Sequence, residues 1–123
     1  MNIALWVVQI LLALVFAAAG IMKATQPTER LATNMGWVKD VAPWTVRLIG
    51  ILEILGAIGL ILPAATGIWP WLTPVAAVGL ALTMVGAMIV HGRRGEFSGI
   101  GFNFVLLALA AFVVFGRFVV VPL

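Results

Sequence analysis

The chain has no cysteine, no tyrosine, one histidine and few charges: 9% of its 123 residues are Asp, Glu, Lys or Arg. Without cysteine, this chain by itself cannot carry out thiol redox chemistry or disulfide exchange, and cannot hold a cysteine-ligated iron–sulfur cluster. A single histidine also argues against a haem or metal site built from several histidines of the chain. We therefore expect no metal site and no intrinsic cofactor.

Apolar residues make up 64% of the chain, far above the level of soluble globular proteins. A transmembrane helix needs about 20 mostly apolar residues, and four segments qualify: residues 3–22, 44–62, 71–90 and 102–121. The first is long for a signal sequence and has no basic segment before it, so we expect it to remain as a span. The fold class predicted is all-α, an antiparallel four-helix transmembrane bundle forming a single domain over residues 1–123.

The connection between the first two spans, residues 23–43, holds most of the polar residues. Thr25 followed by Pro27 favours the start of a short helix over residues 27–35, and Gly36 favours its end. Trp37 and Trp44 are expected at the level of the lipid headgroups. We therefore predict a short interfacial helix after the first span.

The basic residues predict an orientation. With four spans, connections 23–43 and 91–101 share one side of the membrane, and both termini lie on the other. The basic residues on the first side are Lys23, Arg30, Lys39, Arg93 and Arg94. The positive-inside rule makes that side cytoplasmic and puts both termini outside the cell (inner) membrane. Arg117 lies at the opposite end, where we expect it to reach the headgroups. Basic residues near span ends favour contact with the lipid bilayer over nucleic-acid binding.

Glu53 is the most informative residue, because residues 48–62 around it are otherwise apolar or glycine. A charged side chain at the centre of a span costs roughly 2.5–3.5 kcal/mol on insertion scales, so such groups normally face a bundle interior and find a partner. Arg47 lies about 9 Å along the helix axis and about 120° around it from Glu53, which makes it a poor partner. We expect Glu53 to face the interior and to pair with Lys23.

Helical periodicity predicts which other polar residues meet Glu53. Counted from the connection 23–43, Lys23, His91 and Asn103 fall near the membrane boundary, while Glu53 and Thr83 lie roughly 10–15 Å deeper. The inward faces of the spans can therefore bring all five into one half of the bundle. We predict a polar pocket there that opens toward the cytoplasmic side.

Each of these residues also has a purely structural interpretation. Lys23 can be an anchor that extends to the headgroups, and His91, beside two arginines, can be interfacial. Interhelical hydrogen bonding can explain Gln9, Thr83 and Asn103. For Glu53 alone the functional interpretation is favoured, because a buried ion pair is weak evidence for stability.

The pattern resembles the DoxX family of small four-helix membrane proteins. The residues that carry the resemblance are residues 16–23 (FAAAGIMK) closing the first span, Gly50, Glu53 and Gly56 at three-residue steps in the second, and His91 closing the third. The family is named after a small subunit associated with a membrane quinone oxidoreductase. Relatives are linked to oxidative-stress complexes or, in animals, to receptor assembly. The resemblance implies a shared polar site of Lys23, Glu53 and His91.

The leading hypothesis is an accessory or ligand-binding subunit of a quinone-linked membrane oxidoreductase, with a quinone or lipid between the helices. Glu53 would accept or relay a proton, Lys23 would bind a carbonyl oxygen, and His91 would complete the path to water. One alternative is a non-enzymatic assembly or chaperone-like protein that packs against a membrane or membrane-associated protein partner, or against a second copy in a homo-oligomer. Another is a small-solute or proton pathway. Whether the chain is an enzyme stays open.

Overall fold

Four long helices make up most of the structure, a computed structural model that describes residues 1–33 and 35–122. They are α1 (Asn2–Thr25), α3 (Pro43–Thr66), α4 (Leu72–Arg93) and α5 (Phe97–Phe115). Between α1 and α3 lie the short helix α2 (Thr28–Ala32) and the 3₁₀ helix η1 (Gly36–Asp40), and the π-helix η2 (Gly116–Val120) continues α5. The fold is all-α, as the sequence predicted.

Each long helix matches a predicted span, but the connections are shorter than expected. α3 continues to Thr66 and ends at Gly67 in the left-handed conformation, and residues 91–101, predicted to be a glycine-rich loop, are mostly helical. One contact joins the two helical parts of this segment: Gly99, in the first turn of α5, packs against the ring of His91, in the last turn of α4. The propensity of glycine for loops is weak enough for tertiary packing to override it.

The connection 23–43 also differs from its prediction. The helix expected over residues 27–35 is a single turn that ends at Ala32, and Gly36 starts η1 instead of ending a helix. Asn34, which that prediction included, lies outside the described residues. α2 and η1 pack together through a small core of Leu31, Val38 and Val46. This core is what holds the connection against the start of α3.

Pro63 lies inside α3, beyond the predicted end of the second span. Proline has no N–H to donate to the carbonyl four residues earlier, here that of Gly59. The Thr73 hydroxyl of α4 donates to that carbonyl at 3.0 Å, and the Gln9 amide of α1 donates to the next one, Leu60 O, at 2.6 Å. Side chains from two neighbouring helices therefore satisfy the α3 main chain, as a lipid environment requires.

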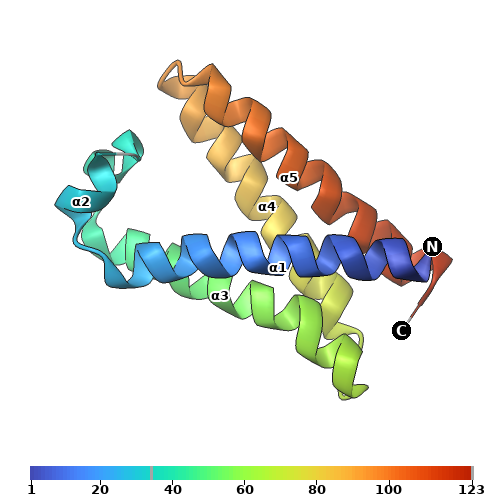
Figure 1. Ribbon diagram of the computed structural model, residues 1–123. Helices are drawn as coiled ribbons and strands as arrows, with labels where there is room; N and C mark the ends of the chain where they lie inside the picture. The colour runs from blue at the N-terminus through green and yellow to red at the C-terminus, as the bar shows by residue number, and fades with distance from the viewer. Residues whose placement is uncertain (34, 123) are drawn as a thin grey trace.

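The four long helices form two antiparallel pairs, α1 with α3 and α4 with α5, which cross each other (Figure 1). α1 and α3 approach most closely at two glycines: a Cβ on Gly20 would lie 2.6 Å from the Gly50 carbonyl oxygen, and one on Gly50 would lie 2.7 Å from that of Gly20. Side chains there would force the helices apart, so the two glycines fix the α1–α3 contact.

The bundle has two distinct ends. One, which we call the terminal end, carries both termini and the α3–α4 turn; the other, the loop end, carries α2, η1 and the α4–α5 turn (Figure 1). The two helix pairs lie close at the terminal end and diverge toward the loop end. This divergence puts the widest part of the bundle beside the predicted site.

The outward faces of the long helices are apolar. Among the exposed side chains are Ile3, Leu14, Leu55, Leu82 and Phe104. All four long helices are long and apolar enough to cross a membrane, and an apolar exterior of this extent is a liability in water. The protein is a multi-pass membrane protein surrounded by a lipid bilayer.

Candidate functional site

Glu53 lies on the inner face of α3 and is 2% exposed. Lys23 Nζ donates a 2.6 Å hydrogen bond to Glu53 Oε1, so the two side chains form a buried ion pair. α1 and α3 are antiparallel and touch at Gly20 and Gly50. Lys23 therefore lies about one turn from that contact toward the loop end, and Glu53 lies about one turn from it toward the terminal end. The lysine side chain therefore extends inward, and the pairing expected from the cost of a lone carboxylate is present.

Arg47 and Trp37 hold Lys23 in this position. Arg47 Nη1 donates to the Lys23 carbonyl oxygen at 2.6 Å, which satisfies a main-chain acceptor in the last turn of α1. The Lys23 ammonium also lies over the Trp37 ring, 5.9 Å from its centre, within the range of a cation–π interaction. Arg47 thus binds the main chain of α1, and the partner of Glu53 is Lys23.

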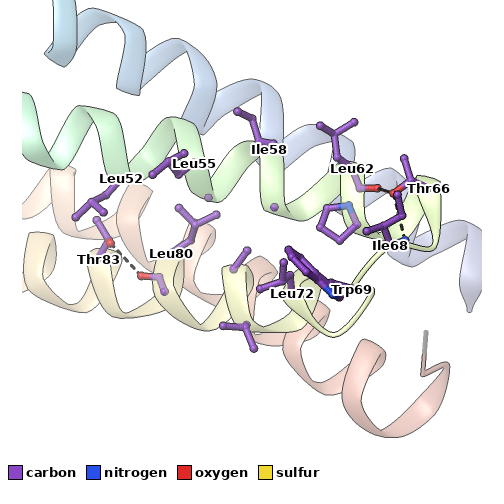
Figure 2. A pocket seen from close by; sticks show the side chains of 16 residues that line it. Leu52, Leu55, Ile58, Leu62, Thr66, Ile68, Trp69, Leu72, Leu80 and Thr83 are labelled. Atoms are coloured by element: carbon purple, nitrogen blue, oxygen red, sulfur yellow. Dashed lines mark hydrogen bonds between the residues drawn. The ribbon is translucent and has the colours of Figure 1, made fainter.

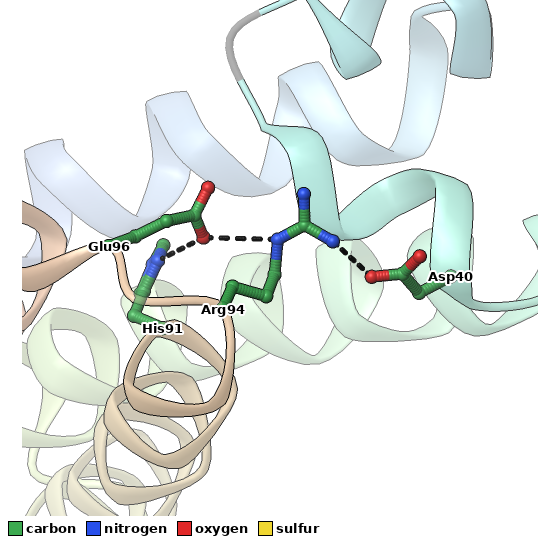
Figure 3. A network of polar contacts seen from close by, with 4 residues as sticks. All are labelled: Asp40, His91, Arg94 and Glu96. Carbon is green, nitrogen blue, oxygen red and sulfur yellow. Dashed lines mark hydrogen bonds and ion pairs between the residues drawn. The ribbon is translucent and has the colours of Figure 1, made fainter.

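A chain of charged side chains joins the two helix pairs at the loop end. His91 Nδ1 lies 3.1 Å from Glu96 Oε1, and Arg94 Nε donates to the same oxygen at 3.2 Å. Arg94 also pairs with Asp40 of η1, across the gap between the α4–α5 turn and the 23–43 connection (Figure 3). The network ties together two segments more than fifty residues apart at the point where the helix pairs diverge.

Asn103 and Thr83 do not make the interhelical hydrogen bonds that their structural interpretation predicted. The Thr83 hydroxyl donates to Gly79 O, one turn earlier on its own helix. Asn103 is 7% exposed, and its Nδ2 has no hydrogen-bond partner among the described residues. A buried unpaired N–H costs free energy comparable to a lost hydrogen bond. Asn103 therefore offers an unused donor inside the bundle.

A cavity of about 630 Å³ lies among the four long helices and η1. Its polar lining residues are Lys23, Glu53, Thr83, His91, Glu96 and Asn103. Aromatic rings of α1, η1 and α5 line it as well, from Phe16, Trp37 and Phe102. The five candidate residues thus meet around one space. Two of its lining residues, His91 and Glu96, belong to the network that joins the helix pairs at the loop end.

The prediction that Arg117 reaches the headgroups was wrong, because the side chain is buried in the bundle. It is 2% exposed, with Nε donating to Gln9 Oε1 at 2.7 Å and Nη1 to Asn2 Oδ1 at 2.8 Å. Its guanidinium lies 5.7 Å from the centre of the Trp6 ring. Gly116 allows this position, because a Cβ there would collide with Leu5. We call Asn2, Trp6, Gln9 and Arg117 the terminal cluster.

Two features of the polar interior were missed in the sequence. The terminal cluster had a signal: Asn2, Trp6 and Gln9 follow at four and three residues and so share one helical face. Arg117 follows Asn103 by fourteen residues, which places both on one face of α5 and η2. Glu96 had no comparable signal, because its contact with His91 depends on a three-residue turn between α4 and α5. Within the described ranges, no three His, Asp or Glu side chains are grouped as a metal site would require.

Comparison with known proteins agrees with this architecture. The family model of the DoxX-like family matches residues 7–113, which include most or all of each long helix and every residue that lines the cavity. The searches of curated proteins and of solved structures found no match. The match covers well over half of the chain. The chain belongs to the DoxX-like family.

Proposed function

We propose that the protein is a ligand-binding accessory subunit of a quinone-linked membrane oxidoreductase system, and that the cavity around Glu53 receives the quinone head group. The observation that carries this proposal is the buried Lys23–Glu53 pair beside an unpaired Asn103 amide in one cavity. Only a polar partner satisfies such groups in a lipid environment. A quinone has two carbonyl oxygens, one acceptor for each of these two donors on different helices.

The chemistry of a quinone matches the lining of the cavity. Its ring is flat and apolar and can lie against Phe16, Trp37 or Phe102, while its two carbonyl oxygens accept hydrogen bonds from Lys23 Nζ and Asn103 Nδ2. Reduction to the quinol adds two electrons and two protons. An oxidoreductase partner supplies the electrons, and Glu53 passes protons to the quinone from His91 and Glu96 at the loop end.

The assembly alternative has less support from the geometry. Gly56 and Gly59 are small residues at which a partner helix could pack, but they approach Leu80 and Ala76 of α4 in the same chain. Gly79 and Gly86 have nothing within 4 Å of their Cβ positions, and Gly86 lines the cavity around Glu53. A ligand site and a protein partner are compatible, since an accessory subunit needs both.

Glu53→Gln tests the proposal. The amide keeps the volume and an acceptor for Lys23 but cannot carry the proton, so we expect a folded protein that fails in complementation and in binding of a tail-less ubiquinone ring. Arg117→Met is the control for a change to a buried charge away from the cavity, and it should bind as wild type does. Wild-type binding and complementation by Glu53→Gln would rule out the functional assignment and favour the assembly alternative.

We also infer that the loop end faces the cytoplasm of the cell (inner) membrane. Four of the basic residues there, Arg30, Lys39, Arg93 and Arg94, are exposed, whereas Arg117 at the opposite end is enclosed by the terminal cluster. Its burial removes the one basic group that opposed this orientation. A reporter fused after residue 123 should be active outside the cytoplasm, and cytoplasmic activity of the fusion would overturn the orientation.

A further inference from the structure

A second, apolar groove of about 710 Å³ runs between α3 and α4 from the middle of the bundle to the α3–α4 turn (Figure 2). On α3 its lining begins at Leu52, next to Glu53, and ends at Thr66, which is roughly 21 Å along the helix at 1.5 Å per residue. Apart from two threonines and the Trp69 indole, every side chain that lines it is apolar. The groove is therefore a long, narrow channel for an apolar chain.

The groove and the cavity around Glu53 meet at Thr83, which lines both. The Thr83 hydroxyl is already bonded to Gly79 O at 3.0 Å, so at the junction it has no unpaired donor that would oppose an apolar chain. On α3 the two linings are also adjacent, with Glu53 in the cavity and Leu52 in the groove. The linings of the two spaces are thus adjacent at this point of the bundle.

Two glycines form the floor of the groove. A Cβ on Gly56 would lie 2.7 Å from Leu80 Cδ2, and one on Gly59 would lie 2.7 Å from the Ala76 Cβ. α3 and α4 are in direct contact there, which closes the groove on its inner side. Gly79 on the wall has nothing within 4 Å of its Cβ position, so the space in front of it is open.

We propose that the groove binds the linear apolar tail of the same ligand whose polar head occupies the cavity around Glu53. The inference rests on the proposed function and specifies the ligand class: an amphiphile with a carbonyl-bearing ring and one unbranched or isoprenoid chain. A tail of about 21 Å covers about two thirds of the roughly 30 Å hydrocarbon core, so it ends near the α3–α4 turn. Its close packing between two helices, rather than its removal from water, is the source of the binding energy.

Photo-crosslinking tests the path of the tail. The probe is a ubiquinone ring whose saturated tail ends in a diazirine, added to the purified protein in phosphatidylcholine nanodiscs, and the labelled residues are identified by peptide mass spectrometry. We expect labels on Leu62, Thr66 and Trp69, which line the far end of the groove. An excess of the tail-less ring should compete for them, and Glu53→Gln should abolish them.

Substitutions at two glycines whose Cβ positions have nothing within 4 Å, Gly79 and Gly101, test whether the probe tail lies in the groove. Gly79→Leu places a side chain in the groove at a position where a Cβ has nothing within 4 Å. It should lower groove labelling by about tenfold or more, while binding of the tail-less ring stays at the wild-type level. Gly79→Ala should give a smaller decrease. The matched control is Gly101→Leu, because Gly101 is also helical, exposed and open but lines neither space. It should leave the labelling unchanged.

Each contrary result has a distinct meaning. Labelling that is equal in wild type and Gly79→Leu, with normal binding of the ring, overturns the tail path alone. Groove labelling that neither the ring nor Glu53→Gln reduces means that bulk lipid chains fill the groove, which also overturns it. If the wild-type protein binds neither probe, the proposed function fails and the tail path fails with it.

Discussion

The two polar clusters of this bundle differ in what their donors do. At the loop end, Lys23 and Glu53 form a charge-balanced pair, and Asn103 Nδ2 beside them has no partner among the described residues. At the terminal end, Gln9 both donates to Leu60 O and accepts from Arg117, and Thr73 donates to Gly59 O. Gln9 and Thr73 thus bind the main chain of α3. Arg117 Nη2 and Asn103 Nδ2 are both buried without a partner among the described residues, but of the two only Asn103 lines the cavity.

This difference distinguishes polar groups that serve the main chain from those that we propose bind a ligand. Around Pro63 the chain needs side-chain donors, because proline interrupts the α3 hydrogen bonds and lipid offers none. The side chains of Thr73 and Gln9 therefore have a structural explanation. No such need exists at the loop end, where Glu53 and Asn103 serve no interrupted main chain. A ligand is the simplest explanation for polar groups placed there at a cost.

The largest effect is expected from breaking the ion pair on one side only. Lys23→Met leaves the Glu53 carboxylate buried without its partner and should lower the free energy of unfolding by about 3–5 kcal/mol. The double variant Lys23→Met, Glu53→Leu removes both charges and should regain most of that loss. Unfolding in mixed detergent micelles measures both. Equal losses in the single and double variants would show that the pair is not coupled.

Loss of Gln9 should be the next largest effect. Gln9→Leu keeps the volume but removes the side-chain donor to Leu60 O and the acceptor of Arg117 Nε, so we expect a loss of about 1–3 kcal/mol. Leu14→Ala, at a lipid-facing position of the same helix, is the control and should change stability little. Ligand retention should be unaffected in both. A Gln9→Leu protein that is stable but loses its ligand would contradict the separation of the two clusters.

Thr73→Val tests whether the terminal donors serve the interrupted helix. It should cost about 1 kcal/mol, because the Gly59 carbonyl loses its donor. In a Pro63→Ala background, the new N–H of residue 63 can bond to that carbonyl, so the same substitution should cost less. The double-mutant cycle gives the coupling directly. Additive costs would mean that Thr73 does not compensate for Pro63.

Arg117→Met should have the smallest effect. It removes a buried cation that has no carboxylate partner among the described residues, and it leaves Gln9 Oε1 with one hydrogen bond fewer. The two changes oppose each other, so the net change in unfolding free energy should stay within about 1 kcal/mol. Thermal unfolding in detergent would detect a larger loss, which would give Arg117 a role that its hydrogen bonds do not explain.

Hydropathy and the cost of a lone charge predicted the spans and the Glu53–Lys23 contact, because each depends on residue type and helical spacing alone. The predicted position of Arg117 was wrong. An arginine at a span end can extend outward or inward, and only the contacts of Gln9 and Gly116 in the assembled bundle decide which direction it takes. The helical residues 91–101 were missed for a related reason: packing of Gly99 on His91 outweighs the local preference of glycine. The cavity volume and the groove depend on how the helix pairs cross, which no local pattern contains.

The most direct test of the central claim is native mass spectrometry of three purified proteins: wild type, Glu53→Gln and Arg117→Met, extracted in mild detergent from the same cells. Both substitutions remove a buried charge, one from each cluster. We predict that wild type and Arg117→Met retain the same small lipophilic molecule and that Glu53→Gln, although folded, does not. Retention by Glu53→Gln, or loss from Arg117→Met alone, would contradict the assignment of the cavity around Glu53 as the ligand site.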